Sequence, residues 1–211
     1  MSAIFFHRTP VWLQKVYPKF SWRKTTTHKE LYLTFDDGPI PEATPMILDH
    51  LNSYQAKATF FCVGENIVKY PEIFKNILEA GHSVGNHTHH HLNGWKTQKK
   101  QYLSDVAQCQ QLISPYVQNK RPLLRPPYGR IRREQWKPLV ESYEIVMWNV
   151  LSGDYSTKVS AERCLYKSIQ SSDPGSIVLF HDNIKTIDKL DNVLPAYLEH
   201  FKSMDYAFLP L

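Results

Sequence analysis

Two adjacent carboxylates, Asp36 and Asp37, end an apolar run in the segment LTFDDGP. Like charges side by side in a partly buried site repel, and without compensation one of them takes up a proton at neutral pH. A divalent metal ion that binds one carboxylate removes this conflict and leaves the other free to accept a proton. Taken alone, the pair is equally typical of a turn in which the aspartates hydrogen-bond their own backbone.

A histidine cluster, HTHHH, supplies candidate partners for the ion. His87 and His91 stand four residues apart, so both can reach one ion from a single turn, although His87 and His90 also have a workable spacing. One Asp and two His leave a fourth position to water, as in catalytic zinc-type sites. Such an ion lowers the pKa of its water to about 7 and polarises a carbonyl oxygen. A solvated polar loop is the alternative.

Further polar groups in the sequence fit around such a centre. Arg125, the first residue of RPPYG, can keep the free aspartate ionised, whereas the Pro-Pro turn after it has an ordinary structural explanation. His181 follows the apolar run SIVLF, and Asp154 is a carboxylate that could orient its ring. This pairing favours a general acid over a buried core histidine.

Short apolar strands alternate with amphipathic helices along the chain. The expected strands are 31–35, 57–63, 82–86, 123–125, 143–150 and 175–182. The expected helices start near Thr44 and Pro71 and then cover 98–113, 133–141, 160–170 and 187–201. This alternation predicts parallel pairing through βαβ units, and hence an α/β fold of the small or incomplete barrel type. All the candidate residues follow or end strands, which places them on the C-terminal rim of such a barrel.

Five segments occur in the order of the motifs of the polysaccharide deacetylases, carbohydrate esterase family 4, also called the NodB homology domain. They are TFDDGP (34–39), HTHHH (87–91), RPPYG (125–129), SGDY (152–155) and LFH (179–181). The chain resembles this family from about Lys29 to its C-terminus. The resemblance implies a distorted, incomplete (β/α)7 barrel with parallel strands. Residues 29–211 would form the catalytic domain, and residues 1–28 an N-terminal arm packed on it.

The resemblance also implies a role for each matching residue. Asp36 would be the general base and His181 the general acid, with Arg125 tuning the base and Asp154 tuning the acid. The metal ligands would be Asp37, His87 and His91. The oxyanion and substrate pocket would be formed by Tyr128, through its backbone N–H, and by Pro127, Tyr155 and Leu179.

The activity implied by the resemblance is metal-dependent hydrolysis of N-acetyl groups on an amino-sugar glycan, such as peptidoglycan or a chitin oligomer. One divalent ion is expected, Zn²⁺ first, while Co²⁺, Ni²⁺ or Mn²⁺ also suit the ligand set. The family's fourth motif commonly ends in Asp-Trp, but here Tyr155 follows Asp154, which leaves the identity of the sugar open. The alternatives are a sugar-binding pseudoenzyme of the same fold, a deacetylase of a lipid-linked sugar and an O-acetyl esterase.

Length and composition narrow the class of protein. The chain has 211 residues and 42% hydrophobic content, which predicts one domain. Its formal net charge is +5, but no nucleic-acid motif accompanies this charge, so we do not expect a nucleic acid as partner. The partner that the resemblance implies is an acetylated carbohydrate. The three cysteines are far apart and predict buried free thiols in a reducing compartment: Cys62, Cys109 and Cys164.

The N-terminal segment bears on location. The apolar run Ala3–Phe6 is interrupted by His7 and is shorter than the core of a signal peptide, so we expect a cytoplasmic protein. Separately, we expect a monomer. The segment TPVWLQKVYPKFSW (9–22) is aromatic and basic enough for weak contact with a membrane surface. Packing of this arm on the domain is the favoured interpretation.

Overall fold

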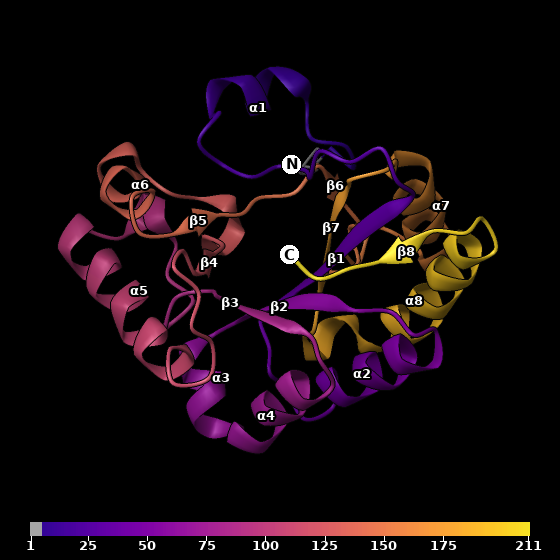
Figure 1. The fold of residues 1–211 in the computed structure, drawn as a ribbon, viewed down its shortest axis with the longest axis horizontal. Helices are drawn as coiled ribbons and strands as arrows, with labels where there is room; N and C mark the ends of the chain where they lie inside the picture. The colour runs from indigo at the N-terminus through magenta and orange to yellow at the C-terminus, as the bar shows by residue number, and fades with distance from the viewer. Residues whose placement is uncertain (1–5) are drawn as a thin grey trace.

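The structure is a computed structural model that describes residues 6–211, so most of the apolar run that begins at Ala3 lies outside the described residues. Its strands form one curled sheet (Figure 1). They are β1 (Glu30–Asp36), β2 (Ala58–Cys62), β3 (Ser83–Asn86), β4 (Leu123–Leu124), β5 (Glu144–Ile145), β6 (Val150–Leu151), β7 (Ile177–His181) and β8 (Ala207–Phe208). The order is β5-β4-β3-β2-β1-β7-β6, with β8 beside β1, and these pairs are parallel. The predicted incomplete (β/α)7 barrel is confirmed.

Helices surround the outer face of the sheet (Figure 1). They are α2 (Thr44–Ser53), α3 (Gly64–Lys69), α4 (Pro71–Glu79), α5 (Lys99–Ile113), α6 (Arg133–Leu139), α7 (Ala161–Ser171) and α8 (Ile187–Lys202). Short 3₁₀ turns are η1 (Gly94–Lys96), η2 (Pro127–Gly129) and η3 (Ile184–Thr186). The predicted helices are present. Helix α3 was not predicted, because it has only six residues and only one buried aliphatic side chain, Ile67, so its sequence shows no helical periodicity.

The prediction of one strand over residues 143–150 is wrong. The segment contributes β5 at one edge of the sheet and β6 at the other edge. Val146 N donates to Leu124 O at 2.9 Å, and Asn149 N donates to Ile177 O at 3.2 Å, so the chain crosses the gap between the edges in residues 147–148. An apolar run indicates burial but does not specify a pairing partner, and this run has two.

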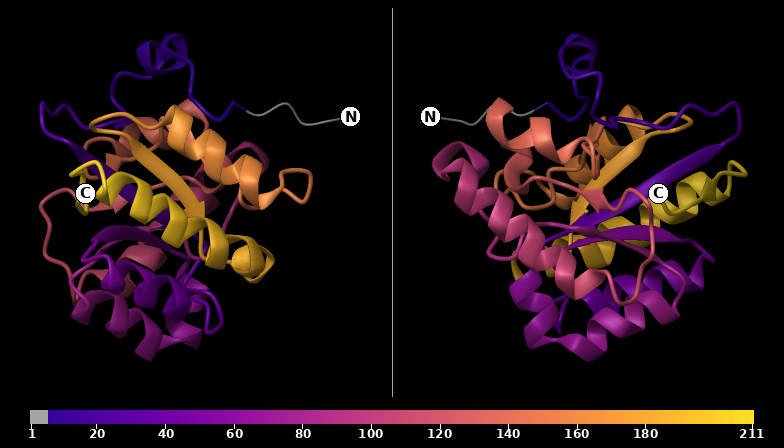
Figure 2. Two further views of the ribbon diagram at one scale, coloured as in Figure 1. Left: turned by 90° about the vertical axis from the view of Figure 1, so that its right-hand side faces the viewer. Right: turned by 60° about the vertical axis from the view of Figure 1, so that its left-hand side comes forward.

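The N-terminal arm lies over this gap. Helix α1 (Val11–Val16) stands at one end of the molecule, as both views of Figure 2 show, and has no buried residue. Beyond it, Phe20 and Trp22 are buried, while Ser21 N donates to Ile145 O at 2.9 Å and Met147 N donates to Ser21 O at 2.7 Å. Residues 20–22 therefore cover the opening that the split strand leaves. None of the helices in residues 6–211 is both long and apolar enough to cross a bilayer.

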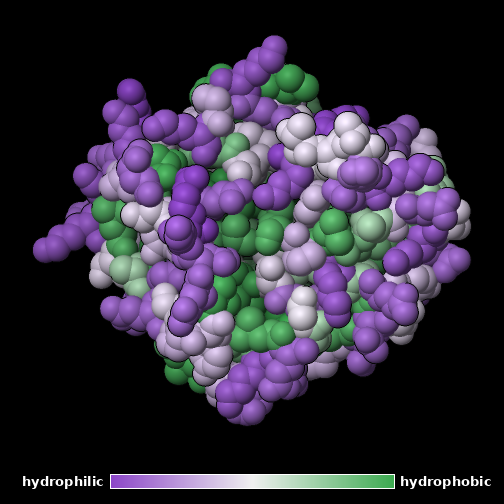
Figure 3. Space-filling view, viewed as in Figure 1, coloured by the Kyte–Doolittle hydropathy of each residue, from purple (hydrophilic) through white to green (hydrophobic). Residues whose placement is uncertain are grey.

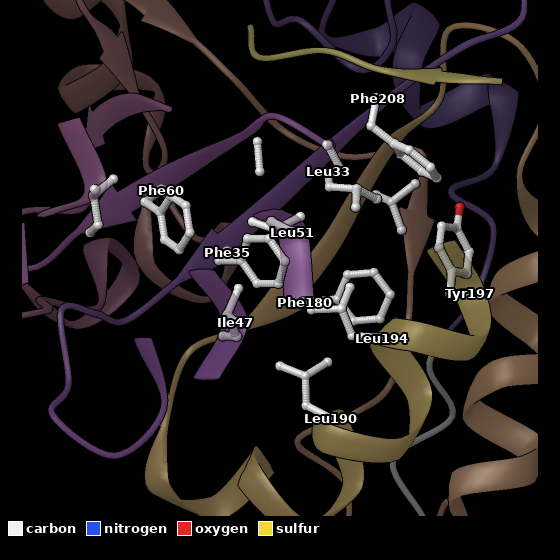
Figure 4. Close-up of a cluster of buried hydrophobic side chains, with 14 of the residues drawn as sticks. Leu33, Phe35, Ile47, Leu51, Phe60, Phe180, Leu190, Leu194, Tyr197 and Phe208 are labelled. Atoms are coloured by element: carbon white, nitrogen blue, oxygen red, sulfur yellow. The ribbon is translucent and has the colours of Figure 1, made fainter. Parts of the chain in front are cut away.

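The main core lies between the sheet and helices α2 and α8 (Figure 4). Phe35 on β1 stacks against Phe60 on β2 and Phe180 on β7, with ring centres 5.1 and 5.9 Å apart. Apolar residues also gather in the middle of the face viewed in Figure 3, with hydrophilic residues around them. The three cysteines are buried free thiols, as predicted. Each buried aromatic ring stabilises the fold by about 1.5–3 kcal/mol.

The register of β1 and β7 brings two candidate site residues together at the C-terminal ends of these strands. In the β1–β7 pair, Asp36 lies opposite His181, and Thr34 lies opposite Leu179. Because the strands are parallel, their C-terminal ends meet at the same rim, and the side chains of opposed residues leave the sheet on the same face. Asp36 and His181 are thus neighbours through backbone pairing alone.

Replacing Phe35 by Ala should lower the free energy of unfolding by about 3–5 kcal/mol, because it removes a fully buried ring from between two others. Urea denaturation followed by circular dichroism measures this loss. Val68→Ala, on the exposed face of α3, is the control and should change stability by less than about 0.5 kcal/mol. Equal midpoints for the two variants would contradict this account of the core.

Candidate active site

A cavity of about 770 Å³ opens at the C-terminal ends of the strands. Most of the site residues predicted from the sequence line it: Asp36, Asp37, His87, His91, Tyr128, Tyr155, Leu179 and His181. Arg125 and Asp154 are buried behind this lining and act on it through hydrogen bonds. Pro127 is buried and is not among the described residues that line the cavity.

Asp37, His87 and His91 offer ligand atoms that all lie within 4.8 Å of one another. His91 Nε2 is 3.1 Å and His87 Nε2 is 3.7 Å from Asp37 Oδ1. One carboxylate oxygen and two imidazole nitrogens that converge in this way form a donor set suited to Zn²⁺ and other late first-row ions.

His87 is oriented as a metal ligand would be. Its Nδ1 is 2.8 Å from Arg125 O, which fixes the proton on Nδ1 and leaves Nε2 as the acceptor facing Asp37. Burial lowers the pKa of His87 to about 4, although the charges of Asp36 and Asp37 oppose this. The ring is therefore neutral at pH 7, which is the state that binds a metal ion.

Asp37 is held in an uncommon conformation. Its φ of 90° is outside the regions that non-glycine residues favour, and such backbone strain persists only where surrounding contacts enforce it. Asn66 Nδ2 donates to Asp37 O at 2.7 Å, and Asn183 Nδ2 donates to Asp37 Oδ2 at 3.1 Å. Burial raises the pKa of Asp37, but the hydrogen bond from His91 and the nearby His181 outweigh burial and lower it below its usual range.

The other histidines of HTHHH lie away from this donor set. The Asp105 carboxylate on α5 accepts from the backbone N–H groups of His89 and His90, at 2.8 and 3.0 Å, and contacts His90 Nδ1. His91 completes the turn with φ of 52° and places its ring 5.1 Å from that of His87. The geometry therefore favours His91 over His90 as the partner of His87.

Asp36 forms a buried ion pair with Arg125. The Arg125 Nη1 is 2.7 Å from Asp36 Oδ1 and also donates to Thr34 Oγ1 at 2.7 Å. Arg125 has no exposed surface, and its guanidinium lies 4.1 Å from the centre of the Phe61 ring. The second oxygen, Asp36 Oδ2, lies 3.8 Å from His87 Nε2 on the cavity side. Asp36 is thus paired with Arg125 through Oδ1, and its Oδ2 faces the cavity.

His181 and Asp154 form the second acid–base pair. The Asp154 carboxylate is 2.9 Å from His181 Nδ1 and accepts from His181 N at 2.7 Å, so Nε2 is the nitrogen left toward the cavity. Burial alone would lower the pKa of His181, but the charge and hydrogen bond of Asp154, with smaller contributions from Asp37 and Asp36, raise it to about 9. A cation bound nearby would lower this value.

Aromatic residues wall the cavity. Tyr128 has φ of 61° and packs its ring 4.7 Å from His91, and Tyr155 packs its ring 5.2 Å from His181 at a steep angle. Trp148, in the crossing of the split strand, also lines the cavity, and Leu179 forms its floor with only 2% exposure. The sequence did not single out Trp148, because its position depends on the chain crossing that the strand prediction missed.

Several supporting residues escaped the sequence analysis. They are Thr34, Asn66, Asp105 and Asn183. Asp182 was noted only as a strand end, yet its buried carboxylate accepts from Gly38 N at 2.9 Å and from Thr44 Oγ1 at 2.8 Å, which fixes the turn after Asp37. In the sequence, such residues could be noticed only as polar side chains next to apolar ones. That pattern does not identify the group to which each side chain hydrogen-bonds.

A family model described as polysaccharide deacetylase matches residues 23–145, more than half of the chain. The chain belongs to this family. It is 38% identical over 172 residues to a peptidoglycan-N-acetylglucosamine deacetylase of Bacillus cereus, which covers 79% of this chain and 62% of that protein. The chain therefore spans less than two thirds of that relative.

Solved structures agree with this placement. A peptidoglycan N-acetylglucosamine deacetylase superposes with a TM-score of 0.87 at 32% identity, covering 96% of this chain and 95% of that one. A family 4 carbohydrate esterase pseudoenzyme from Bacillus anthracis superposes with a TM-score of 0.78 at 25% identity, covering 89% and 65%. The family thus contains both deacetylases and pseudoenzymes, so membership alone does not establish activity, and the residues of the site are needed to distinguish the two.

Asp154→Asn should lower the pKa of His181 from about 9 to its ordinary value or below, because it removes the charge that opposes burial. At pH 8 His181 is protonated in the native protein and neutral in the variant. An NMR titration of the histidine rings in metal-free protein measures this. The same substitution at an exposed pair, Asp191→Asn beside His50, is the control. A variant in which His181 still titrates near 9 would refute the assignment.

Proposed function

We propose that the protein is a metal-dependent deacetylase that removes N-acetyl groups from an amino-sugar glycan of the peptidoglycan type. One observation carries the proposal: a possible metal donor set, the carboxylate of Asp36 and the imidazole of His181, which Asp154 orients, face one cavity. A binding module needs neither the base nor the acid, so their presence argues against a pseudoenzyme.

Asp37, His87 and His91 would hold a single divalent ion, with Zn²⁺ the first expectation. When bound, such an ion supplies Lewis-acid polarisation of a carbonyl oxygen and lowers the pKa of water. The strained Asp37 backbone and the fixed His87 tautomer support this role, since both keep the donor atoms in place before any ion arrives.

Asp36 would act as the general base. Its second oxygen faces the cavity and can take a proton from the attacking water, while Arg125 pairs with Oδ1 on the other side. The Arg125 pair also prevents rotation of the carboxylate, because Nη1 fixes one of its two oxygens. Attack at the acetamide carbon then produces a tetrahedral centre with a negative oxygen, near which the backbone N–H of Tyr128 is the proposed donor.

His181 would act as the general acid. Asp154 raises the pKa of His181, which favours a protonated Nε2, and holds the ring so that this proton would point into the cavity. Transfer of the proton to the amide nitrogen breaks the carbon–nitrogen bond, and acetate and a free amino sugar leave. Leu179, Tyr155 and Trp148 would enclose the acetyl group and exclude bulk water.

Two features support an N-acetylglucosamine-containing polymer as substrate. Two of the proteins reported above are named for peptidoglycan N-acetylglucosamine, and the cavity of about 770 Å³ opens to solvent at the strand ends. Tyr155 stands 44% exposed and lines the cavity, where an aromatic side chain suits a sugar ring.

Asp36→Asn and His181→Ala should each lower kcat for acetate release from N-acetylglucosamine oligomers by about 10²–10⁴-fold while metal content stays equal. The reason is that each removes one proton-transfer group and leaves the donor set intact. Assays with added Zn²⁺ or Co²⁺ and metal analysis of the same samples measure both quantities. Asp49→Asn, exposed on α2, is the matched control. Normal turnover in either site variant would refute its role, and absence of turnover in the native protein with retained oligomer binding would favour the pseudoenzyme.

His91→Ala should weaken Zn²⁺ binding by about 100-fold or more, because it removes one of three protein ligands. His90→Ala is the matched control within the same turn, and it should keep metal affinity within about tenfold because His90 contacts Asp105 instead. Competition with a chromophoric chelator gives both constants. The reverse order of affinities would assign the site to His87 and His90.

A further inference from the structure

A band of cations borders one side of the cavity. Segments 95–100 and 130–137 carry seven Lys and Arg residues and one acidic residue, Glu134. The seven are exposed and form what we call the basic strip: Lys96, Lys99, Lys100, Arg130, Arg132, Arg133 and Lys137. The chain as a whole has only five more basic than acidic residues, so positive charge is concentrated here.

Backbone and side-chain hydrogen bonds hold the two segments together. Gly94 N donates to Arg130 O at 3.1 Å. The buried amide of Gln135 on α6 donates to the carbonyl oxygens of Gly94 and Thr97 at 2.9 and 3.0 Å. Helices α5 and α6, which carry the outer part of the strip, lie together on one side of the barrel in Figure 1. The strip is therefore one defined surface.

The strip meets the cavity at Arg130. Arg130 lines the cavity, and its guanidinium lies 5.0 Å from the centre of the Trp95 ring, which is 56% exposed. Arg132 also donates to the backbone carbonyl of Trp95, so two cations contact this residue. An exposed indole suits the apolar face of a sugar ring, and the adjacent guanidinium suits an anionic substituent. A polymer that leaves the cavity on this side would meet both.

Some of these cations stand where their helices disfavour positive charge. Lys99 and Lys100 begin the 15-residue helix α5, whose first turn has no acidic residue. Arg133 begins α6, whose first turn contains one acidic residue, Glu134. The N-terminal end of a helix is the positive end of its dipole, which favours Asp or Glu. These charges lower stability at the place where they stand, and a bound anionic chain would offset that loss.

We propose that the basic strip binds the carboxylate-bearing portion of a glycan strand whose acetamido sugar occupies the cavity. Peptidoglycan has this chemistry, because its N-acetylglucosamine alternates with a sugar that carries a lactyl carboxylate or an acidic peptide. A neutral N-acetylglucosamine oligomer lacks these anions. The inference rests on the proposed function. It adds that the protein also binds the anionic sugar or peptide next to the sugar that is deacetylated.

Co-sedimentation of the metal-free chain with purified peptidoglycan sacculi tests the strip without turnover. Native sacculi should bind about tenfold more tightly than sacculi whose carboxylates have been amidated, and added salt should weaken only the first interaction. Lys99→Gln combined with Arg133→Gln should reduce binding to native sacculi about fivefold without lowering Tm, since both charges oppose their helix dipoles. Turnover of neutral oligomers should not change.

Lys120→Gln combined with Lys202→Gln is the control, because it removes the same charge outside the basic strip, from the loop after α5 and from the last residue of α8. Its binding should equal that of the native chain. Equal binding to native and amidated sacculi, equal loss in the two double variants, or tighter binding to duplex DNA would each overturn the proposal. Carboxylate-dependent binding without acetate release from any substrate would support the strip and contradict the proposed hydrolysis.

Discussion

The guanidinium of Arg125 is fully buried, and one carboxylate, that of Asp36, balances its charge. Its remaining donors bind Thr34 on β1 and the carbonyl oxygens of Val146 and Met147, at 3.3 and 2.9 Å, in the split strand. Removing one member of a buried ion pair costs about 3–5 kcal/mol, because the other charge is left uncompensated in a poorly solvated interior. The same pair thus stabilises the barrel and fixes the candidate base.

The carbonyl of Arg125 extends this arrangement to the metal donor set, because it accepts from His87 Nδ1. The base and one ligand of the donor set are therefore both positioned by Arg125. On the opposite side, Asp154 holds His181 through both its ring and its backbone. Two buried charges outside the cavity, one positive and one negative, thus orient the two groups that face the cavity.

The barrel type, the parallel sheet and most helices were predictable because apolar periodicity and strand–helix alternation are local features of the sequence. The chemistry-bearing residues at the strand ends were predictable as well, since Asp36 and His181 end apolar runs and His87 lies in a histidine cluster. The split of residues 143–150 was not predictable, because pairing depends on which edges lie within reach. Nor were Asn66, Asp105 and Asn183, whose hydrogen bonds join residues 15 to 146 positions apart along the chain.

The crossing between Val146 and Asn149 sets the circumference of this barrel. A closed barrel fixes its diameter by hydrogen bonds between all neighbouring strands. Here the edge strands β5 and β6 are joined by covalent chain, with Trp148 facing the cavity and residues 20–22 covering the outside. The width of the site is therefore governed by the length of a peptide tether, and an insertion there would widen the cavity without breaking any strand pair.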